Sequence, residues 1–154
     1  MCTIVGAAPG ALPILLGWTA AGRPVIGEGL TLFAILFLWQ FPHFLAIAWR
    51  YRDEYAAAGL QMLPARGSQR IVGLLAATYA LALIPVSLLP REQGLAGNVY
   101  AVTALVLGAW YAAASLRFAQ RGTEASARRL LRVSLVYLPI LLAVLLFDHW
   151  RLLQ

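Results

Sequence analysis

The segment "LFLWQFPHFLAIAWRYRDEY", residues 36–55, joins an apolar run to a charged cluster. On a continuous helix, with about 100° per residue, His43, Arg50 and Glu54 lie within about 20° of one line. This line would extend roughly 16 Å, from the polar pair of Gln40 and His43 to the charged end. Polar side chains inside a membrane are costly, so they tend to face the bundle interior or a water-filled cavity. The spacing therefore predicts a polar path with a charged mouth, where an anionic group could bind.

Each member of this path also has a purely structural interpretation. His43 could hydrogen-bond to a neighbouring helix, and Arg50 and Arg52 could be interfacial anchors whose stems lie along apolar surface. Asp53 and Glu54 could do no more than pair with those arginines. What favours a functional site is the combination of these side chains on one helix face within one short segment.

The elements that must position these residues are membrane-spanning helices. Four stretches carry no charged residue and are long enough to cross roughly 30 Å of hydrocarbon. They are residues 4–22, 29–49, 71–89 and 95–116. A fifth run, 133–147, is shorter but can extend past Asp148. With 62% hydrophobic and 12% charged residues, the composition excludes an ordinary soluble domain. The sequence predicts an all-α, polytopic membrane helix bundle of about five transmembrane helices, in a single domain over residues 1–154.

The basic residues indicate the orientation of this bundle. All 12 are Arg, and nine of them lie in the loops 50–70 and 117–132, against Arg23, Arg91 and Arg151 on the other side. The positive-inside rule places the two basic loops in the cytoplasm or the equivalent matrix side. We expect a bacterial cytoplasmic (inner) membrane, with the mitochondrial inner membrane as the alternative. The net charge of +6 follows from this topology and does not indicate a nucleic-acid partner.

The first residues, "MCTIVGAAPGALP", enter an apolar span without the basic region of a secretory signal. We therefore expect that Met1 is an internal start and that the chain is the C-terminal part of a longer protein. Cys2 is the only cysteine, which excludes an internal disulfide and a cysteine metal cluster.

The run "LFLWQFPHFLAIAWRYRDEYAAAGLQMLP" resembles the second half of the protohaem IX farnesyltransferases (haem O synthases), a branch of the UbiA-type intramembrane prenyltransferases. The preceding "IVGAAPGALPILLGWTAAG" resembles the span before it in that family. The similarity is strong over residues 3–70 and mainly topological over 71–154. The family has nine spans, so the resemblance implies that this chain corresponds to helices five to nine. The family's early Asp-rich motif, N-x-x-x-D-x-x-x-D, has no counterpart here.

The resemblance implies roles for individual residues. Asp53 and Glu54 occupy the second acidic motif, which in the family holds the prenyl diphosphate through Mg²⁺; the family usually has Asp where this chain has Glu54. His43 matches a family His that faces the haem, as an axial ligand or a close polar partner. The implied substrate-binding residues are His43, Gln40, Arg50, Arg52 and Tyr55, and the implied catalytic and metal-binding residues are Asp53 and Glu54.

The implied reaction is transfer of the prenyl group of farnesyl diphosphate to the vinyl group of haem B, which gives haem O for terminal oxidases. Mg²⁺ is the implied cofactor, and haem B is a substrate. Departing diphosphate oxygens need a cation and Arg donors to neutralise them. The allylic carbocation needs an apolar, aromatic-lined cavity that excludes water. The expected partners are the lipid bilayer, the two substrates, a missing N-terminal half, and haem-pathway or oxidase assembly proteins.

Two alternatives remain open at this point. One is a UbiA-type prenyltransferase with an aromatic or quinone-precursor acceptor. The other is an inactive membrane fragment, which the missing first acidic motif favours for this chain alone.

Overall fold

The computed structural model describes residues 2–59 and 68–154, with the side chains of the first helix described from residue 9 onward. These residues form helices and no strand. The helices are α1 (Cys2–Ala20), α2 (Glu28–Arg50), α3 (Arg52–Ala57), α5 (Gln69–Val86), α6 (Leu89–Glu92), α7 (Asn98–Arg121) and α8 (Glu124–Leu152). The expected all-α class is confirmed.

Four segments of the described chain are long and apolar enough to cross a membrane. They are Glu28–Arg50, Gln69–Glu92, Asn98–Arg121 and Glu124–Leu152. The last one contains the expected fifth run and does continue past Asp148. α1 is a further helix of 19 residues that lies along α2. Large apolar side chains such as Val106 and Leu146 are exposed on the outer faces, which suits contact with lipid. The protein is therefore an integral membrane helix bundle.

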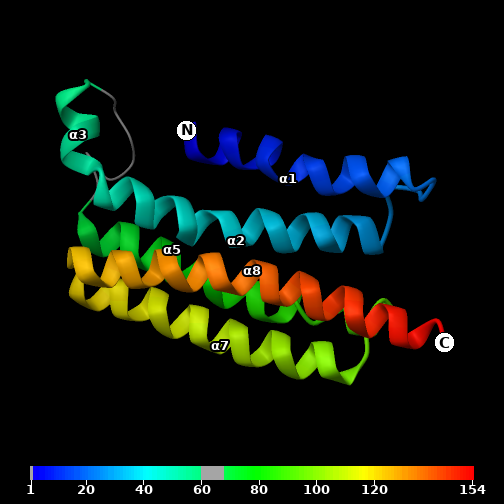
Figure 1. Ribbon diagram of the computed structural model, residues 1–154. Coiled ribbons are helices and arrows are strands. Elements are labelled where there is room, and N and C mark those ends of the chain that lie inside the picture. Colours follow the sequence, from blue (N-terminus) through cyan, green and yellow to red (C-terminus); the bar gives the residue numbers. More distant parts are fainter. Residues whose placement is uncertain (1, 60–67) are drawn as a thin grey trace.

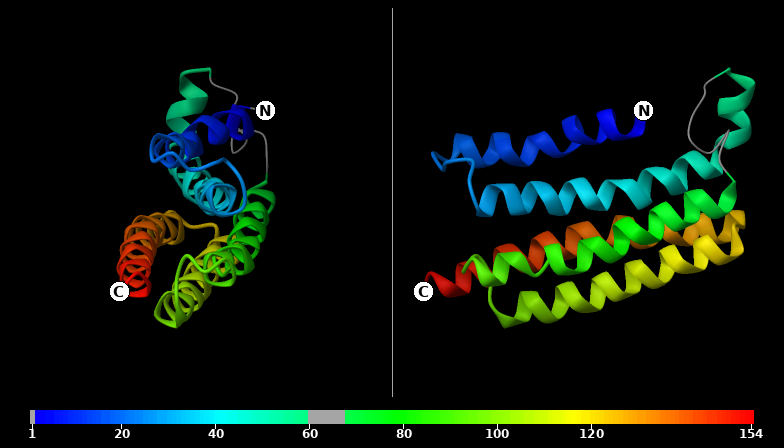
Figure 2. Two further views of the ribbon diagram at one scale, coloured as in Figure 1. Left: turned by 90° about the vertical axis from the view of Figure 1, so that its right-hand side faces the viewer. Right: turned by 180° about the vertical axis from the view of Figure 1, so that it is seen from behind.

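The five long helices run alternately in opposite directions (Figure 1). Seen end-on, α2, α5, α7 and α8 form a bundle, and α1 lies on its outside against α2 (Figure 2). As a result α3, the start of α5 and the turn between α7 and α8 share one end, while α6 and the C-terminus lie at the other (Figure 1). The described residues of the two Arg-rich stretches of the sequence, 50–59, 68–70 and 117–132, lie toward the first of these ends, and residues 60–67 lie outside the described part of the chain.

Close helix approach holds the bundle together. A Cβ on Gly73 of α5 would collide with the backbone of Ala119 on α7, and one on Gly108 would come within 3.0 Å of the Ile84 side chain. In a bilayer, helix association depends on such close packing because lipid is as apolar as the helices themselves. The α5–α7 contact therefore needs the glycine at position 73.

The orientation of the bundle is tested by labelling single cysteines. With Cys2 replaced by Ser, Ala58→Cys at the end of α3 should react with a membrane-impermeant maleimide in inverted vesicles and not in intact cells. Leu153→Cys, at the opposite end, should show the reverse pattern. The reason is the excess of Arg at the α3 end. Labelling of Ala58→Cys from outside intact cells would contradict the orientation.

Candidate functional site

The sequence predicts one line of polar side chains from His43 through Arg50 to Glu54, and this prediction is wrong. α2 ends at Arg50, Tyr51 has non-helical dihedral angles (φ −100°, ψ 18°), and α3 begins at Arg52. α3 turns away from the axis of α2 (Figure 1). Glu54 therefore lies on a separate short helix, and the stripe computed for a continuous helix ends at Arg50.

The break at Tyr51 has a local cause. The Arg52 guanidinium donates a 3.0 Å hydrogen bond from Nη1 to the carbonyl of Trp49 and lies 4.9 Å from the centre of the Trp49 ring. A basic side chain near a helix end commonly satisfies the last carbonyls in this way. Trp49 in turn donates from Nε1 to the carbonyl of Gly122, 3.2 Å away in the α7–α8 turn. Trp49 thus links the end of α2 to the rest of the bundle.

His43 makes a specific contact with α8. Its Nδ1 lies 2.8 Å from the hydroxyl of Ser134, which is fully buried. One helical turn earlier, Trp39 donates from Nε1 to the backbone carbonyl of Ser134 at 2.9 Å. The rings of Trp39 and His43 stack with their centres 4.9 Å apart, as residues at i and i+4 can. Two side chains of α2 are therefore held by one residue of α8.

A third helix, α7, joins this contact one turn from Pro42. Proline has no N–H for the carbonyl of Leu38 and crowds the preceding turn, so the local helix ladder is weakened. Groups from neighbouring helices often satisfy backbone atoms at such places in membrane proteins. Tyr111 of α7 donates its hydroxyl at 3.0 Å to the carbonyl of Trp39, the residue that follows Leu38. Tyr111 and Ser134 were not expected from the sequence; the only signal was that each is a hydroxyl side chain within an apolar span.

Gln40 points toward a different neighbour. It is buried, and a Cβ on Gly10 of α1 would collide with its Oε1. Its Nε2 donates to the carbonyl of Leu36 at 3.2 Å, while Oε1 has no partner among the described residues. Gln40 thus lies against α1, and His43 lies against α8. The two do not form the joint polar pair that the sequence predicts.

The acidic residues of α3 are open to solvent. Asp53 lies 3.4 Å from Arg52 with 86% of its side chain exposed, and Glu54 is exposed beside it. Within residues 2–59 and 68–154, no three His, Cys, Asp or Glu side chains gather as a metal site. Mg²⁺ is often held by one or two carboxylates together with substrate phosphates, instead of by an all-protein cage. Two adjacent exposed carboxylates fit that kind of site.

A cluster of arginines on α8 lies at the same end of the bundle as α3 (Figure 1). Arg128, Arg129 and Arg132 line a hollow of about 480 Å³ together with Ala125. Arg128 pairs with Glu124 at 3.1 Å. For Arg129 and Arg132, no carboxylate of the described chain lies within ion-pair distance. In the sequence these residues indicate only the orientation of the bundle, but guanidinium groups also donate paired hydrogen bonds to phosphate oxygens.

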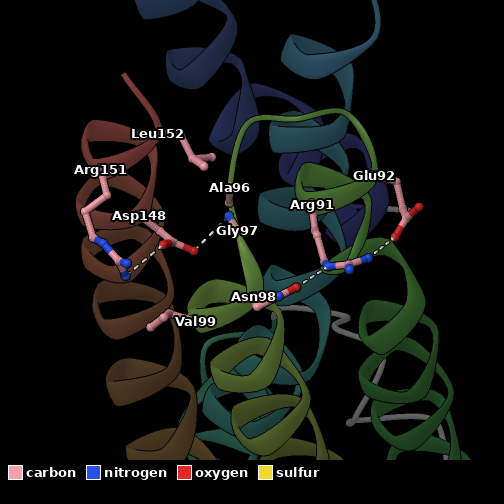
Figure 3. A pocket seen from close by; sticks show the side chains of 9 residues that line it. All are labelled: Arg91, Glu92, Ala96, Gly97, Asn98, Val99, Asp148, Arg151 and Leu152. Atoms are coloured by element: carbon pink, nitrogen blue, oxygen red, sulfur yellow. Dashed lines mark hydrogen bonds and ion pairs between the residues drawn. The ribbon is translucent and has the colours of Figure 1, made fainter. Parts of the chain in front are cut away.

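The opposite end has a polar hollow of about 540 Å³ whose charges are paired internally (Figure 3). Asp148 is buried and accepts hydrogen bonds from the backbone N–H groups of Gly97, at 2.7 Å, and Tyr100, at 3.0 Å. Arg91 binds Asn98 and Glu92. Asp148 therefore satisfies the start of α7, where free N–H groups need an acceptor. This arrangement is structural.

Comparison with known proteins identifies the family. The sequence pattern of the UbiA prenyltransferase family matches residues 1–137. The chain is 46% identical to a protein named protoheme IX farnesyltransferase from Solibacter usitatus, over 96% of this chain and 51% of that protein. Proteins of the same name from Koribacter versatilis and Thiobacillus denitrificans are 45% and 42% identical, over 97% and 96% of this chain and 51% and 49% of their own length. The chain spans about half the length of the curated relatives it matches, and no solved structure is significantly similar to it. The chain belongs to the UbiA prenyltransferase family.

Proposed function

We propose that this chain is the C-terminal part of an enzyme that transfers the prenyl group of farnesyl diphosphate to the vinyl group of haem B, giving haem O. The name of the relatives supports this reaction. The observation that carries it is the arrangement around α2: an interior histidine held on α8, and two exposed carboxylates just beyond the helix end. A bacterial cytoplasmic membrane is the proposed location.

The diphosphate site would lie at the α3 end of the bundle. Asp53 and Glu54 would hold Mg²⁺, which when bound neutralises negative charge on the phosphate oxygens. Arg50 and Arg52 end α2 and begin α3 beside these carboxylates, and the α8 arginines lie at the same end. Guanidinium groups bind phosphate oxygens through paired N–H donors. Tyr55, which is half-buried on α3, would be a further substrate-binding residue at this end of the bundle.

The haem site would lie deeper along α2. His43 is seven residues before the end of α2, which is about 10 Å along the helix. Its ring is flanked by Trp39 on one face and by Phe44 at 5.6 Å, edge to face. Aromatic neighbours keep bulk water from a reactive cation, and a neutral imidazole is a common haem ligand. Gln40, which lies against α1, is the further substrate-binding residue of this proposal.

The proposed enzyme would need more than this chain. The relatives are about twice as long, so we propose that an N-terminal half supplies the first acidic motif. Haem-pathway and oxidase assembly proteins are the further proposed partners. The bilayer surrounds the exposed apolar faces of the bundle.

An assay in membranes tests the reaction. The gene should be expressed with any upstream in-frame coding sequence retained, and in parallel from Met1 alone. With haem B, farnesyl diphosphate and Mg²⁺, mass spectrometry should detect a haem enlarged by one farnesyl group and one hydroxyl group, the hydroxyl coming from water with release of a proton. Prenylation of 4-hydroxybenzoate in place of haem would indicate the alternative acceptor class. No product from either form of the gene would support an inactive fragment.

A further inference from the structure

The hydroxyl of Ser134 lies between two partners, and it has only one proton to donate. Its Oγ is 2.7 Å from the carbonyl of Leu131 and 2.8 Å from Nδ1 of His43. The carbonyl can only accept. If the hydroxyl proton pointed at His43 instead, the lone pairs of two oxygens would face each other at 2.7 Å. The Ser134 proton therefore lies on the Leu131 side.

This geometry fixes the ring of His43. Because Ser134 donates to Leu131, its Oγ must accept from His43, so Nδ1 must carry a hydrogen. In a neutral imidazole the other nitrogen then has a free lone pair. No side chain of the described residues lies within hydrogen-bond distance of Nε2. The Trp39 ring, which is bonded to the carbonyl of the same Ser134, lies stacked on one face of the imidazole.

We infer that Ser134 is a positioning residue: it holds His43 as the Nδ1–H tautomer and leaves Nε2 as a free electron-pair donor for an electrophilic ligand. The tautomer follows from the contacts alone. The identity of the ligand as the iron of haem B rests on the proposed function. A histidine that binds a metal usually donates its other N–H to a partner that fixes the ring, and Ser134 occupies that place.

The chain contains an internal reference for this inference. It has two histidines, and His149 places its Nδ1 2.8 Å from the backbone carbonyl of Leu95. A carbonyl only accepts, so His149 must also carry its proton on Nδ1. Only the proton position in His43 depends on Ser134. Ser115 is a matched control because it is also fully buried, and among the described residues its hydroxyl bonds to the carbonyl of Tyr111 alone.

The test is ¹⁵N NMR of histidine-labelled protein in lipid nanodiscs, at a pH where imidazole is neutral, followed by titration with haem B. In the wild-type protein both histidines should show a protonated Nδ1 and an unprotonated Nε2. Ser134→Ala should move His43 toward the Nε2–H tautomer, leave His149 unchanged, and weaken haem binding roughly 10–100-fold. Ser134→Thr, which retains a hydroxyl, should restore both properties, and Ser115→Ala should change neither.

An Nε2–H tautomer of His43 in the wild-type protein would overturn the inference. So would a Ser134→Ala protein whose tautomer and haem affinity match the wild type. The expected tautomers together with no saturable haem binding in any protein would support the positioning role and count against haem in the proposed function. The two proposals can therefore fail separately.

Discussion

Replacing His43 by alanine is expected to abolish the saturable shift of the Soret band when haem B is added to the protein in nanodiscs. The substitution removes the imidazole nitrogen that the contact with Ser134 leaves free. The remaining Trp39 and Phe44 rings can contact a porphyrin but supply no nitrogen ligand to iron. Residual, non-saturable partitioning of haem into lipid should persist. The measurement is difference absorbance against haem concentration.

His149→Ala is the matched control for this experiment. His149 is the other histidine of the chain, and it is bonded to the carbonyl of Leu95 at the far end of the bundle. Its replacement should leave the Soret titration unchanged. Equal spectra from the two variants, with both proteins folded, would remove His43 from the haem site. The interior histidine would then be a structural group that joins α2 to α8.

The helices could be predicted because each apolar run leaves little choice of structure. Residues 29–49 carry no charge, and in a bilayer a helix satisfies its own backbone hydrogen bonds. The structure places a helix at Glu28–Arg50, within one residue of that run. The break at Tyr51 could not be read in the same way. It depends on where Arg52 and Trp49 place their side chains after the helix leaves the apolar region.

The candidate site was predictable only in part, for a related reason. The sequence indicates that His43 is polar and interior, but its partner Ser134 is 91 residues away. Periodicity along one helix shows which residues share a face, and it does not show which helix covers that face. Asp148 is a similar case, because the groups that stabilise it are backbone N–H groups of another helix. The roles of Asp53 and Glu54 come from the resemblance and stay predictions.

The double variant Asp53→Asn, Glu54→Gln is expected to lower turnover by about 100-fold or more in membranes that carry out the proposed reaction. These carboxylates are exposed at the end of the bundle that also carries the α8 arginines. Amides keep the size of the side chains but lose the charge that Mg²⁺ prefers. A loss of about 3 kcal/mol in transition-state stabilisation corresponds to the 100-fold effect. The measurement is the rate of haem O formation at several Mg²⁺ concentrations.

Two further variants make this experiment specific. Glu54→Asp should keep most of the activity, because it retains a carboxylate and restores the residue that the resembled family usually has there. Glu92→Gln removes an acid that is likewise exposed and paired with a neighbouring Arg, but at the other end of the bundle. It should leave both turnover and the Mg²⁺ dependence unchanged. If the double variant behaves like Glu92→Gln, α3 does not hold the metal, and the diphosphate must be bound without Asp53 and Glu54.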